Sequence, residues 1–127
     1  MSLKIFLVED DEIYAEFIKR HLRRKYKLYS FTNAEDCLVT FKSIRPDVIL
    51  LDYYLPGMNG MEMFEIIKDQ LKDDIRLIML SGMEDGNLVM DLIKKGVRDY
   101  VVKDEKVIES LFAVIEGKED SLYGLSN

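Results

Sequence analysis

The sequence predicts an α/β protein with a flavodoxin-like, doubly wound parallel sheet of five strands in the order 2-1-3-4-5 and five helices. Short apolar runs alternate with longer amphipathic runs along the 127 residues, which is the pattern of successive β/α units. The run from Val48 to Leu51 is apolar without interruption, as expected of a strand buried on both faces. Right-handed crossovers then place helices on both faces of the sheet, and this strand order is the usual solution for five strands.

The first half of the chain is predicted to hold three strands and two helices. The strands are Lys4–Val8, Lys27–Phe31 and Val48–Asp52, and the helices run to about Arg24 and from Thr32 to just before Pro46. Apolar residues that recur at helical spacing after Asp11 indicate the first helix. Thr32 and Glu35 have the spacing of a capping box, which predicts the start of the second. The strand Lys27–Phe31 is the more polar one, so we place it at an edge of the sheet.

The second half continues the same alternation. Its strands are Arg76–Leu80 and Tyr100–Val102, and its helices are Gly60 to about Leu71, Asn87–Lys95 and Lys106 to about Glu116. Gly96 follows the middle helix, and glycine there is typical of a helix end. A polar side chain closes each strand of this half, Ser81 in one case and Lys103 in the other.

Length and composition limit the possible functions. The 127 residues are 48% hydrophobic and 33% charged, which is typical of one soluble domain. We expect residues 1–117 to form this domain, and the polar residues 118–127 to be a linker or a disordered end. The formal net charge of −6 argues against nucleic-acid and anionic-membrane binding, and no apolar run is as long as a membrane span, so we expect a cytoplasmic protein. Cys37, the single cysteine, has apolar neighbours that predict a core residue.

Polar side chains end four of the predicted strands. Glu9 and Asp10 follow the first strand, Asp52 ends the third, and Ser81 and Lys103 end the fourth and fifth. In the order 2-1-3-4-5 the chain reverses direction between the first and third strands, so a crevice is expected at their carboxyl ends. Independent helix-capping residues would gather at this edge only by accident. We therefore interpret the set as a functional site.

The charges at this edge indicate its chemistry. Two carboxylates about 4 Å apart repel each other by roughly 4 kcal/mol at an effective dielectric constant near 20, so three of them require a cation. Oxygen ligands without His or Cys favour a hard ion, and a site with few protein ligands suits Mg²⁺. Asp52 can then act as a nucleophile toward phosphorus, with Lys103 and Ser81 contacting the phosphoryl oxygens. The simpler interpretation of Lys103 is a salt bridge to Asp52.

Four short stretches carry these residues, LVEDD, VILLDYYLPGMNG, MLSG and DYVVK. Together they resemble the response-regulator receiver domains of two-component signalling, of which the chemotaxis response regulator is one. The first stretch resembles the acidic pair of the family and the second its phosphoacceptor motif. The third resembles the Ser/Thr switch position and the fourth the aromatic and lysine positions. The match runs from about Leu3 to Glu116, and the four motifs are highly specific in combination.

The resemblance implies a phosphorylation-operated signalling switch that is not an enzyme. Asp52 would accept a phosphoryl group from a phosphohistidine on a histidine kinase or a phosphotransfer protein. The domain would assist its own phosphorylation and dephosphorylation. Phosphorylation would change the surface that meets a downstream effector or a second copy of the chain.

The resemblance also implies a metal ion, Mg²⁺ with Mn²⁺ as the alternative. Its ligands would be Asp10, Asp52 and the backbone carbonyl of Tyr54, with Glu9 bound through a water. The phosphate-binding and switch roles of the family would belong to Ser81, Tyr100 and Lys103.

One departure from the family pattern follows Lys103. The family usually has a proline there with a cis bond, whereas this chain has Asp104. A cis bond without proline costs about 2.5–4 kcal/mol, so we predict a trans bond, with Asp104 capping the last helix. The departure puts the reach of Lys103 in question.

The helix Asn87–Lys95 carries more apolar residues than one buried face requires. Some of them must then be exposed or covered by a partner. An interaction face formed by this helix, the fifth strand and the last helix is expected to include Leu88, Val89, Met90 and Phe112. The alternative is that all of them pack internally.

Two other functions are weighed beside the switch. A pseudo-receiver would bind partners without phosphoryl chemistry, but the acceptor, the acidic pair, the hydroxyl and the lysine are all present. A Mg²⁺-dependent phosphatase of the dehalogenase type would need a second acid where this chain has Tyr54. Tyr54 and Met83 are also expected to flank the phosphoryl group and slow its hydrolysis, unless both side chains point to solvent.

Overall fold

The computed structural model of the protein describes residues 2–72, 74–82 and 86–117. Within them, five parallel strands form one sheet in the order β2-β1-β3-β4-β5, which confirms the predicted fold class. The strands are β1 (Lys4–Val8), β2 (Lys27–Phe31), β3 (Val48–Asp52), β4 (Arg76–Ser81) and β5 (Asp99–Val102). The helices are α1 (Glu12–Leu22), α2 (Ala34–Phe41), α3 (Gly60–Leu71), α4 (Gly86–Lys94) and α5 (Val107–Ile115).

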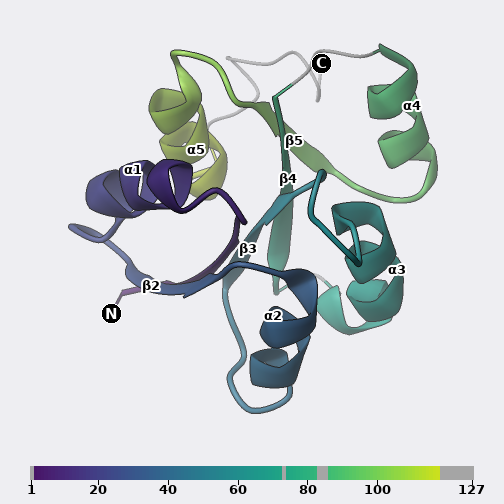
Figure 1. Ribbon diagram of the computed structural model, residues 1–127, viewed down its shortest axis with the longest axis horizontal. Coiled ribbons are helices and arrows are strands. Elements are labelled where there is room, and N and C mark those ends of the chain that lie inside the picture. Colours follow the sequence, from purple (N-terminus) through teal and green to yellow (C-terminus); the bar gives the residue numbers. More distant parts are fainter. Residues whose placement is uncertain (1, 73, 83–85, 118–127) are drawn as a thin grey trace.

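The sheet lies between two helical layers, with α1 and α5 on one face and α2, α3 and α4 on the other (Figure 1). All five residues of β3 are buried, because β3 pairs with both β1 and β4 and is covered on both faces. Alternate residues of the strands belong to different cores. Ile49 and Leu51 pack toward α2, α3 and α4, whereas Leu50 packs toward α1 and α5.

The start of α2 differs from the prediction. Asn33, not Thr32, precedes the helix, and its side-chain oxygen accepts a 2.7 Å hydrogen bond from the backbone N–H of Asp36. The predicted capping box of Thr32 and Glu35 was wrong by one residue. Both Thr and Asn can cap a helix, and each has an acidic residue three positions further on, Glu35 for Thr32 and Asp36 for Asn33, so the spacing did not distinguish them. The Glu35 carboxylate instead accepts a 3.3 Å hydrogen bond from the N–H of Met58, in the loop that follows β3.

A capping box that the sequence analysis missed fixes the start of α3. Asn59 accepts from the N–H of Glu62, and the Glu62 carboxylate accepts from the N–H of Asn59, both at 2.9 Å. Gly60 then passes close to the end of β3, where a Cβ atom would lie 2.5 Å from the carbonyl oxygen of Asp52. Only glycine permits this approach, so the sequence locks the loop after β3 against Asp52.

The peptide bond between Lys103 and Asp104 is trans, as predicted. Asp104 does not cap α5 directly, however, because Lys106 precedes the helix and provides no side-chain cap. The Asp104 carboxylate accepts from the N–H of Lys106 at 2.9 Å and so closes a turn two residues before the helix. The predicted cap is therefore corrected to a turn that leads from Lys103 into α5.

Cys37 lies in the core, fully buried, and burial raises the pKa of its thiol to about 12. This agrees with the predicted packing role. Across 2–72, 74–82 and 86–117, none of the helices combines the length and the apolar character needed to cross a membrane. The predictions for Met83 and for residues 118–127 lie outside the described residues.

Candidate functional site

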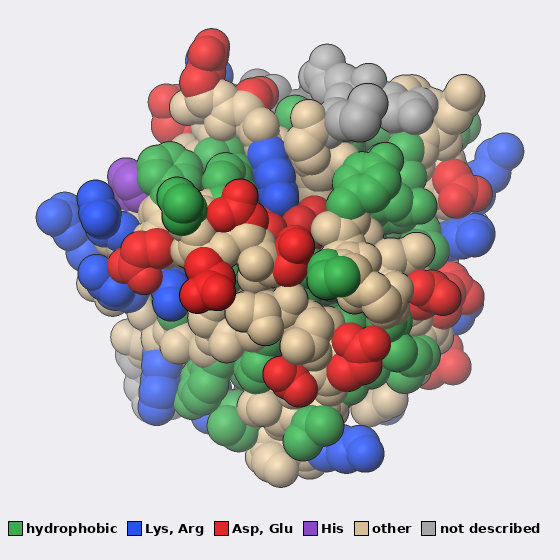
Figure 2. Space-filling model, in the orientation of Figure 1, with side chains coloured by type: hydrophobic (Ala, Val, Ile, Leu, Met, Phe, Trp, Pro, Cys, Tyr) green, Lys and Arg blue, Asp and Glu red, His purple; other side chains and the backbone are tan. Residues whose placement is uncertain are grey.

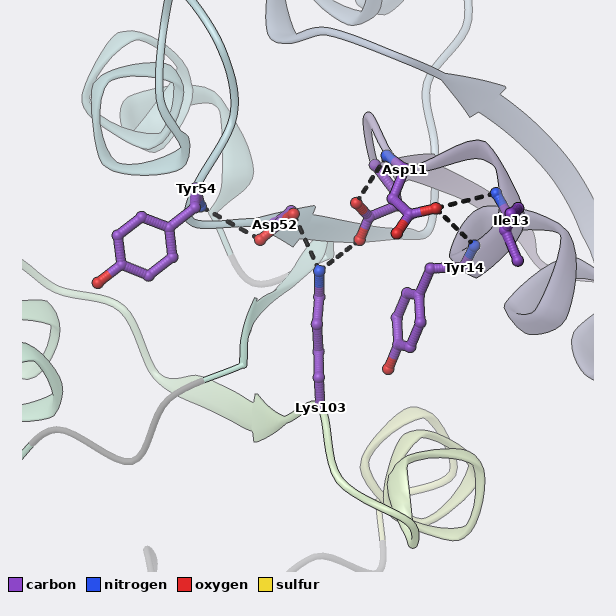
Figure 3. A network of polar contacts seen from close by, with 7 residues as sticks. Asp11, Ile13, Tyr14, Asp52, Tyr54 and Lys103 are labelled. Carbon is purple, nitrogen blue, oxygen red and sulfur yellow. Dashed lines mark hydrogen bonds and ion pairs between the residues drawn. The ribbon is translucent and has the colours of Figure 1, made fainter.

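Three charged side chains from three strand ends meet at the carboxyl edge of the sheet. Asp52 is the last residue of β3, Glu9 follows β1, and Lys103 follows β5. The Lys103 Nζ atom lies 2.5 Å from Oε1 of Glu9 and 3.0 Å from Oδ2 of Asp52. Figure 3 shows Lys103 reaching up to the Asp52 carboxylate. The trans bond after Lys103 thus does not prevent it from reaching the site.

Burial makes these charges interact strongly. Only 1% of the Glu9 side chain and 5% of the Asp52 side chain are exposed, and 17% of Lys103. Burial raises the pKa of Glu9 to about 7, although hydrogen bonds from Lys103 and from the Asp11 N–H oppose the shift. Burial alone would lower the pKa of Lys103, but its hydrogen bonds to Glu9 and Asp52 raise it overall. The lysine is therefore held as a cation between two carboxylates.

Asp10 adds a third carboxylate to this edge. One oxygen each from Glu9, Asp10 and Asp52 can be chosen so that all lie within 4.8 Å of one another. Asp10 is exposed, whereas the other two are buried. Figure 2 shows acidic side chains in red around a basic one in blue near the middle of this face. An all-oxygen set of three carboxylates, open to solvent on one side, fits a hard divalent cation that keeps some of its waters.

Backbone N–H groups orient the two buried carboxylates. The N–H of Tyr54 donates to Oδ1 of Asp52 at 3.2 Å, and the N–H of Asp11 donates to Oε2 of Glu9 at 3.0 Å. Asp11 also caps α1, since its side chain accepts from the N–H groups of Ile13 and Tyr14. The loops after β1 and β3 thus fix which carboxylate oxygens face Lys103.

The two remaining predicted site residues lie on β4 and β5. Ser81 ends β4 and is fully buried, and its carbonyl accepts a 2.8 Å hydrogen bond from the N–H of Lys103. Tyr100 is partly buried on β5, beside Met79 of β4, and packs on the core under α3 and α4. Ser81 is therefore next to the acidic edge, and Tyr100 lines the groove beside α4.

Tyr54 is about half exposed, 53%. Its ring packs edge-on against Tyr53, with the ring centres 4.7 Å apart. Figure 3 shows this ring pointing away from the Asp52 carboxylate. The arrangement supports the alternative in which the Tyr54 side chain points to solvent, and not a cover over the phosphoryl position.

Tyr14 also belongs to this site, although the sequence analysis did not single it out. Its ring lies under the ammonium group of Lys103, with 4.7 Å from Nζ to the ring centre. Burial raises the pKa of the Tyr14 hydroxyl to about 12, so this side chain is neutral. The available signal was its spacing, because Tyr14 follows Asp10 by one helical turn and α1 starts at the site.

The predicted interaction face is only partly exposed. Met90 and Ile93 are 54% and 52% exposed, whereas Leu88 and Leu92 form the inward stripe of α4. The alternative in which every apolar residue packs internally is therefore wrong. Val89, Ile93 and Tyr100 line a groove of about 350 Å³ between α4 and β5.

Two members of the predicted face need correction. Leu88 is 9% exposed, because it points at the sheet one turn before Leu92. Phe112 packs on the other face of the sheet, with its ring centre 6.0 Å from that of Tyr26. Of the three predicted residues on α4, Val89 and Met90 lie on its outer side, whereas Phe112, on α5, packs toward Tyr26.

A second groove, of about 420 Å³, lies at the opposite, amino end of β4 and β5. Lys68, Lys72 and Lys95 line it together with Arg76 and Asp99. The lysines stand at or just beyond the carboxyl ends of α3 and α4, where cations offset the helix dipole. Their presence is explained by helix stability, and the acidic edge is the functional candidate.

The doubly wound sheet, with three carboxylates and a lysine at its carboxyl edge, is the arrangement expected of a receiver domain. The family model described as "Response regulator receiver domain" matches residues 5–116. The chain therefore belongs to the receiver-domain family of two-component response regulators, as the four motifs predicted.

Known relatives agree with this assignment. The chemotaxis protein CheY of Listeria monocytogenes is 30% identical over 119 residues, which cover 86% of this chain and 95% of CheY. The transcriptional regulatory protein CrdR of Helicobacter pylori is 29% identical over 104 residues, covering 81% of this chain and 49% of CrdR. The beryllofluoride-activated receiver domain of DrrB, a Thermotoga maritima protein, has a TM-score of 0.81 at 27% identity, covering 93% of this chain and 97% of that domain. The chain spans about half or less of the length of the first curated relatives that it matches.

Proposed function

We propose that Asp52 accepts a phosphoryl group from a phosphohistidine on a partner histidine kinase or phosphotransfer protein. The observation that carries this proposal is the placement of the Asp52 carboxylate. It is buried at the end of β3, with the Tyr54 N–H on one oxygen and the Lys103 ammonium on the other. This carboxylate is suited to nucleophilic attack on phosphorus, because its backbone is rigid and the neighbouring cation can stabilise the charge of an arriving phosphoryl group.

In this transfer an oxygen of Asp52 attacks the phosphorus while the bond from phosphorus to the imidazole nitrogen breaks. A new P–O bond forms, and the electron pair of the broken P–N bond stays on the nitrogen. The imidazole leaves as a neutral ring because its other nitrogen carries a proton. The Lys103 ammonium stabilises the negative charge of the phosphoryl oxygens, because it already lies 3.0 Å from Asp52.

The residues present fit a divalent cation. Mg²⁺, or Mn²⁺ in its place, would be held by Asp10, Asp52 and the Tyr54 carbonyl, with Glu9 close enough to contact it through water. When bound, such an ion neutralises charge on the phosphoryl oxygens. Glu9 and Asp52 orient the Lys103 ammonium from the buried side of the site.

The proposed switch connects Asp52 to the outer side of α4. A phosphoryl group on Asp52 draws the Ser81 hydroxyl toward it, and Tyr100 moves into the volume that Ser81 vacates. Tyr100 lines the groove beside α4, so this movement changes the surface around Val89 and Met90. A downstream effector or a second copy of the chain would respond to that change.

The test is incubation of the purified protein with Mg²⁺ and acetyl phosphate, followed by intact-protein mass spectrometry. We expect an adduct of one phosphoryl group on the parent and none on Asp52→Asn. Ser81→Ala should accept the group, but the NMR signal of the Met90 methyl group should shift only in the parent. A folded parent that forms no adduct would favour the pseudo-receiver. Steady phosphate release with no adduct would favour the phosphatase.

A further inference from the structure

Three side chains surround the Lys103 ammonium, namely the carboxylates of Glu9 and Asp52 and the aromatic ring of Tyr14. Carboxylates of Glu9 and Asp52 approach this ammonium at 2.5 and 3.0 Å, and the Tyr14 ring centre lies 4.7 Å from it. Figure 3 shows the ring beside the lysine side chain, on α1. We propose that Tyr14 is a positioning residue, which holds the Lys103 ammonium at Asp52 through a cation–π contact. The inference rests on the proposed function for its effect on phosphoryl transfer.

The charges of the site explain why a ring serves here better than another anion. Lys103 has a flexible stem of four carbons and stands on the loop that follows β5. A fourth carboxylate would attract the ammonium, but it would add to the repulsion among Glu9, Asp10 and Asp52. The face of an aromatic ring attracts a cation without carrying a formal charge. Tyr14 therefore restrains the lysine while leaving the net charge of the site unchanged.

The phenol hydroxyl is not needed for this role. The Tyr14 hydroxyl is buried and has no hydrogen-bond partner within the described residues. A buried hydroxyl without a hydrogen bond destabilises the folded state, because its lost hydration is not replaced. The ring face, which Phe also has, is the part of the side chain that meets Lys103. Tyr14→Phe should therefore behave like the parent, whereas Tyr14→Leu removes the contact.

Tyr26 provides a matched control. Its side chain is also buried, with 7% of the residue exposed. Its ring, however, packs against Phe112 and is 6.0 Å from the Nζ of Lys25, far from the acidic edge in the fold. Tyr26→Leu thus removes a buried tyrosine ring without touching Lys103.

The first measurement is independent of phosphoryl chemistry. An aromatic ring beside the lysine shifts the NMR signals of the Lys103 ε-methylene protons upfield, and the signal is assigned by its absence in Lys103→Met. We expect Tyr14→Phe and Tyr26→Leu to retain the upfield shift and Tyr14→Leu to lose it. A signal that does not move in Tyr14→Leu would overturn the contact.

The second measurement is the rate of phosphorylation by saturating acetyl phosphate in Mg²⁺. Losing a cation–π contact should slow Tyr14→Leu by about threefold to tenfold. The phosphorylation rates of Tyr14→Phe and Tyr26→Leu should stay within about twofold of that of the parent. The Mg²⁺ concentration for half-maximal rate should also stay within about twofold in every variant. If Tyr14→Leu does not fold, Tyr14→Met offers a flexible side chain of similar length without a ring.

The outcomes separate this inference from the proposed function. A parent that is not phosphorylated contradicts the proposed function, and the lysine NMR signal then decides on Tyr14 alone. A phosphorylated parent with an equally fast Tyr14→Leu would overturn the positioning role. So would a Tyr14→Phe variant as slow as Tyr14→Leu, because the hydroxyl would then be the active group.

Discussion

The two ends of the same sheet treat charge in opposite ways. At the amino end, the carboxylates have partners: Asp99 forms an ion pair with Arg76 at 3.4 Å, and Asp47 accepts a 2.8 Å hydrogen bond from the backbone N–H of Lys4. At the carboxyl end, three carboxylates lie within 4.8 Å of one another. Among the described residues, Lys103 is the cation that pairs with two of them, and Asp10 has no ion pair.

The difference shows how structural and functional charges can be told apart. A partly exposed ion pair contributes about 0–1 kcal/mol to the stability of the folded protein. Two buried like charges about 4–5 Å apart repel by about 3–4 kcal/mol at an effective dielectric constant near 20. A protein that keeps such repulsion has a site that becomes more stable when a cation or an electrophile arrives.

The largest effect should come from removing the cation at the carboxyl end. Lys103→Met leaves Glu9 and Asp52 without their partner, and breaking a buried ion pair typically costs about 3–5 kcal/mol. The lysine is 17% exposed, so we expect the lower limit, about 3 kcal/mol. The matched change at the amino end is Arg76→Met, which should cost about 1 kcal/mol. Urea unfolding at neutral pH, with divalent ions chelated, measures both.

Millimolar Mg²⁺ separates the two variants further. The ion should restore part of the stability lost in Lys103→Met, because a second cation then meets the same carboxylates. It should leave the loss in Arg76→Met unchanged. If both variants lost the same stability and neither responded to Mg²⁺, the two ends of the sheet would not differ in how they use charge.

Sequence patterns predicted the side chains at strand ends because those depend on local signals. The unbroken apolar run of β3 located Asp52, and the strand order located the edge at which Asp52 and Lys103 meet. The spacing of Tyr14 from Asp10 could have placed it near the site, but its contact with Lys103 depends on how closely α1 approaches the loop after β5. Phe112 was misplaced for the same reason, because sequence does not show which neighbour a helix turns toward.

Helix caps show the same limit on a smaller scale. Thr32 and Asn33 are both good caps, and the difference between them is one residue of backbone geometry. Sequence therefore located the helix and not its cap. Patterns with a period of several residues are predictable, whereas contacts between elements depend on distances set by the whole fold.

A smaller effect is expected from the titration of Glu9. Burial raises its pKa from 4.5 to about 7 in the folded protein. Because the folded-state pKa lies above the unfolded one, the stabilising contribution is fully present below pH 4.5 and is lost as the pH rises through about 7. At about 1.4 kcal/mol per pKa unit, the loss should be about 2 kcal/mol between roughly pH 5 and pH 7.5. Urea unfolding across this range, without divalent ions, measures it.

Glu9→Gln is the control for this pH dependence. The variant cannot titrate at this position, so its stability should change less with pH over the same interval than that of the parent. Asp99→Asn at the amino end should keep the slope of the parent. A slope that survives in Glu9→Gln would assign the titration to another group.

The smallest effect is the sharpest test, because the two ends should respond with opposite signs. Asp10→Asn removes an exposed carboxylate that repels Glu9 and Asp52 and has no ion pair among the described residues. It should raise the free energy of unfolding by about 0.5–1 kcal/mol without divalent ions, since exposure screens part of the repulsion. Asp99→Asn removes the partner of Arg76 and should lower it by about the same amount.

Adding Mg²⁺ should reverse the order of stability between the parent and Asp10→Asn, but not the order between the parent and Asp99→Asn. The parent gains stability in proportion to the occupancy of its acidic site, whereas Asp10→Asn has lost a ligand and gains less. At sufficient Mg²⁺ the variant that was more stable becomes the less stable one, while Asp99→Asn stays below the parent throughout. Thermal unfolding over a Mg²⁺ titration follows the crossing. If Asp10→Asn is destabilised even without Mg²⁺, its carboxylate is a structural group like Asp99, and the excess charge at this edge is not what the cation relieves.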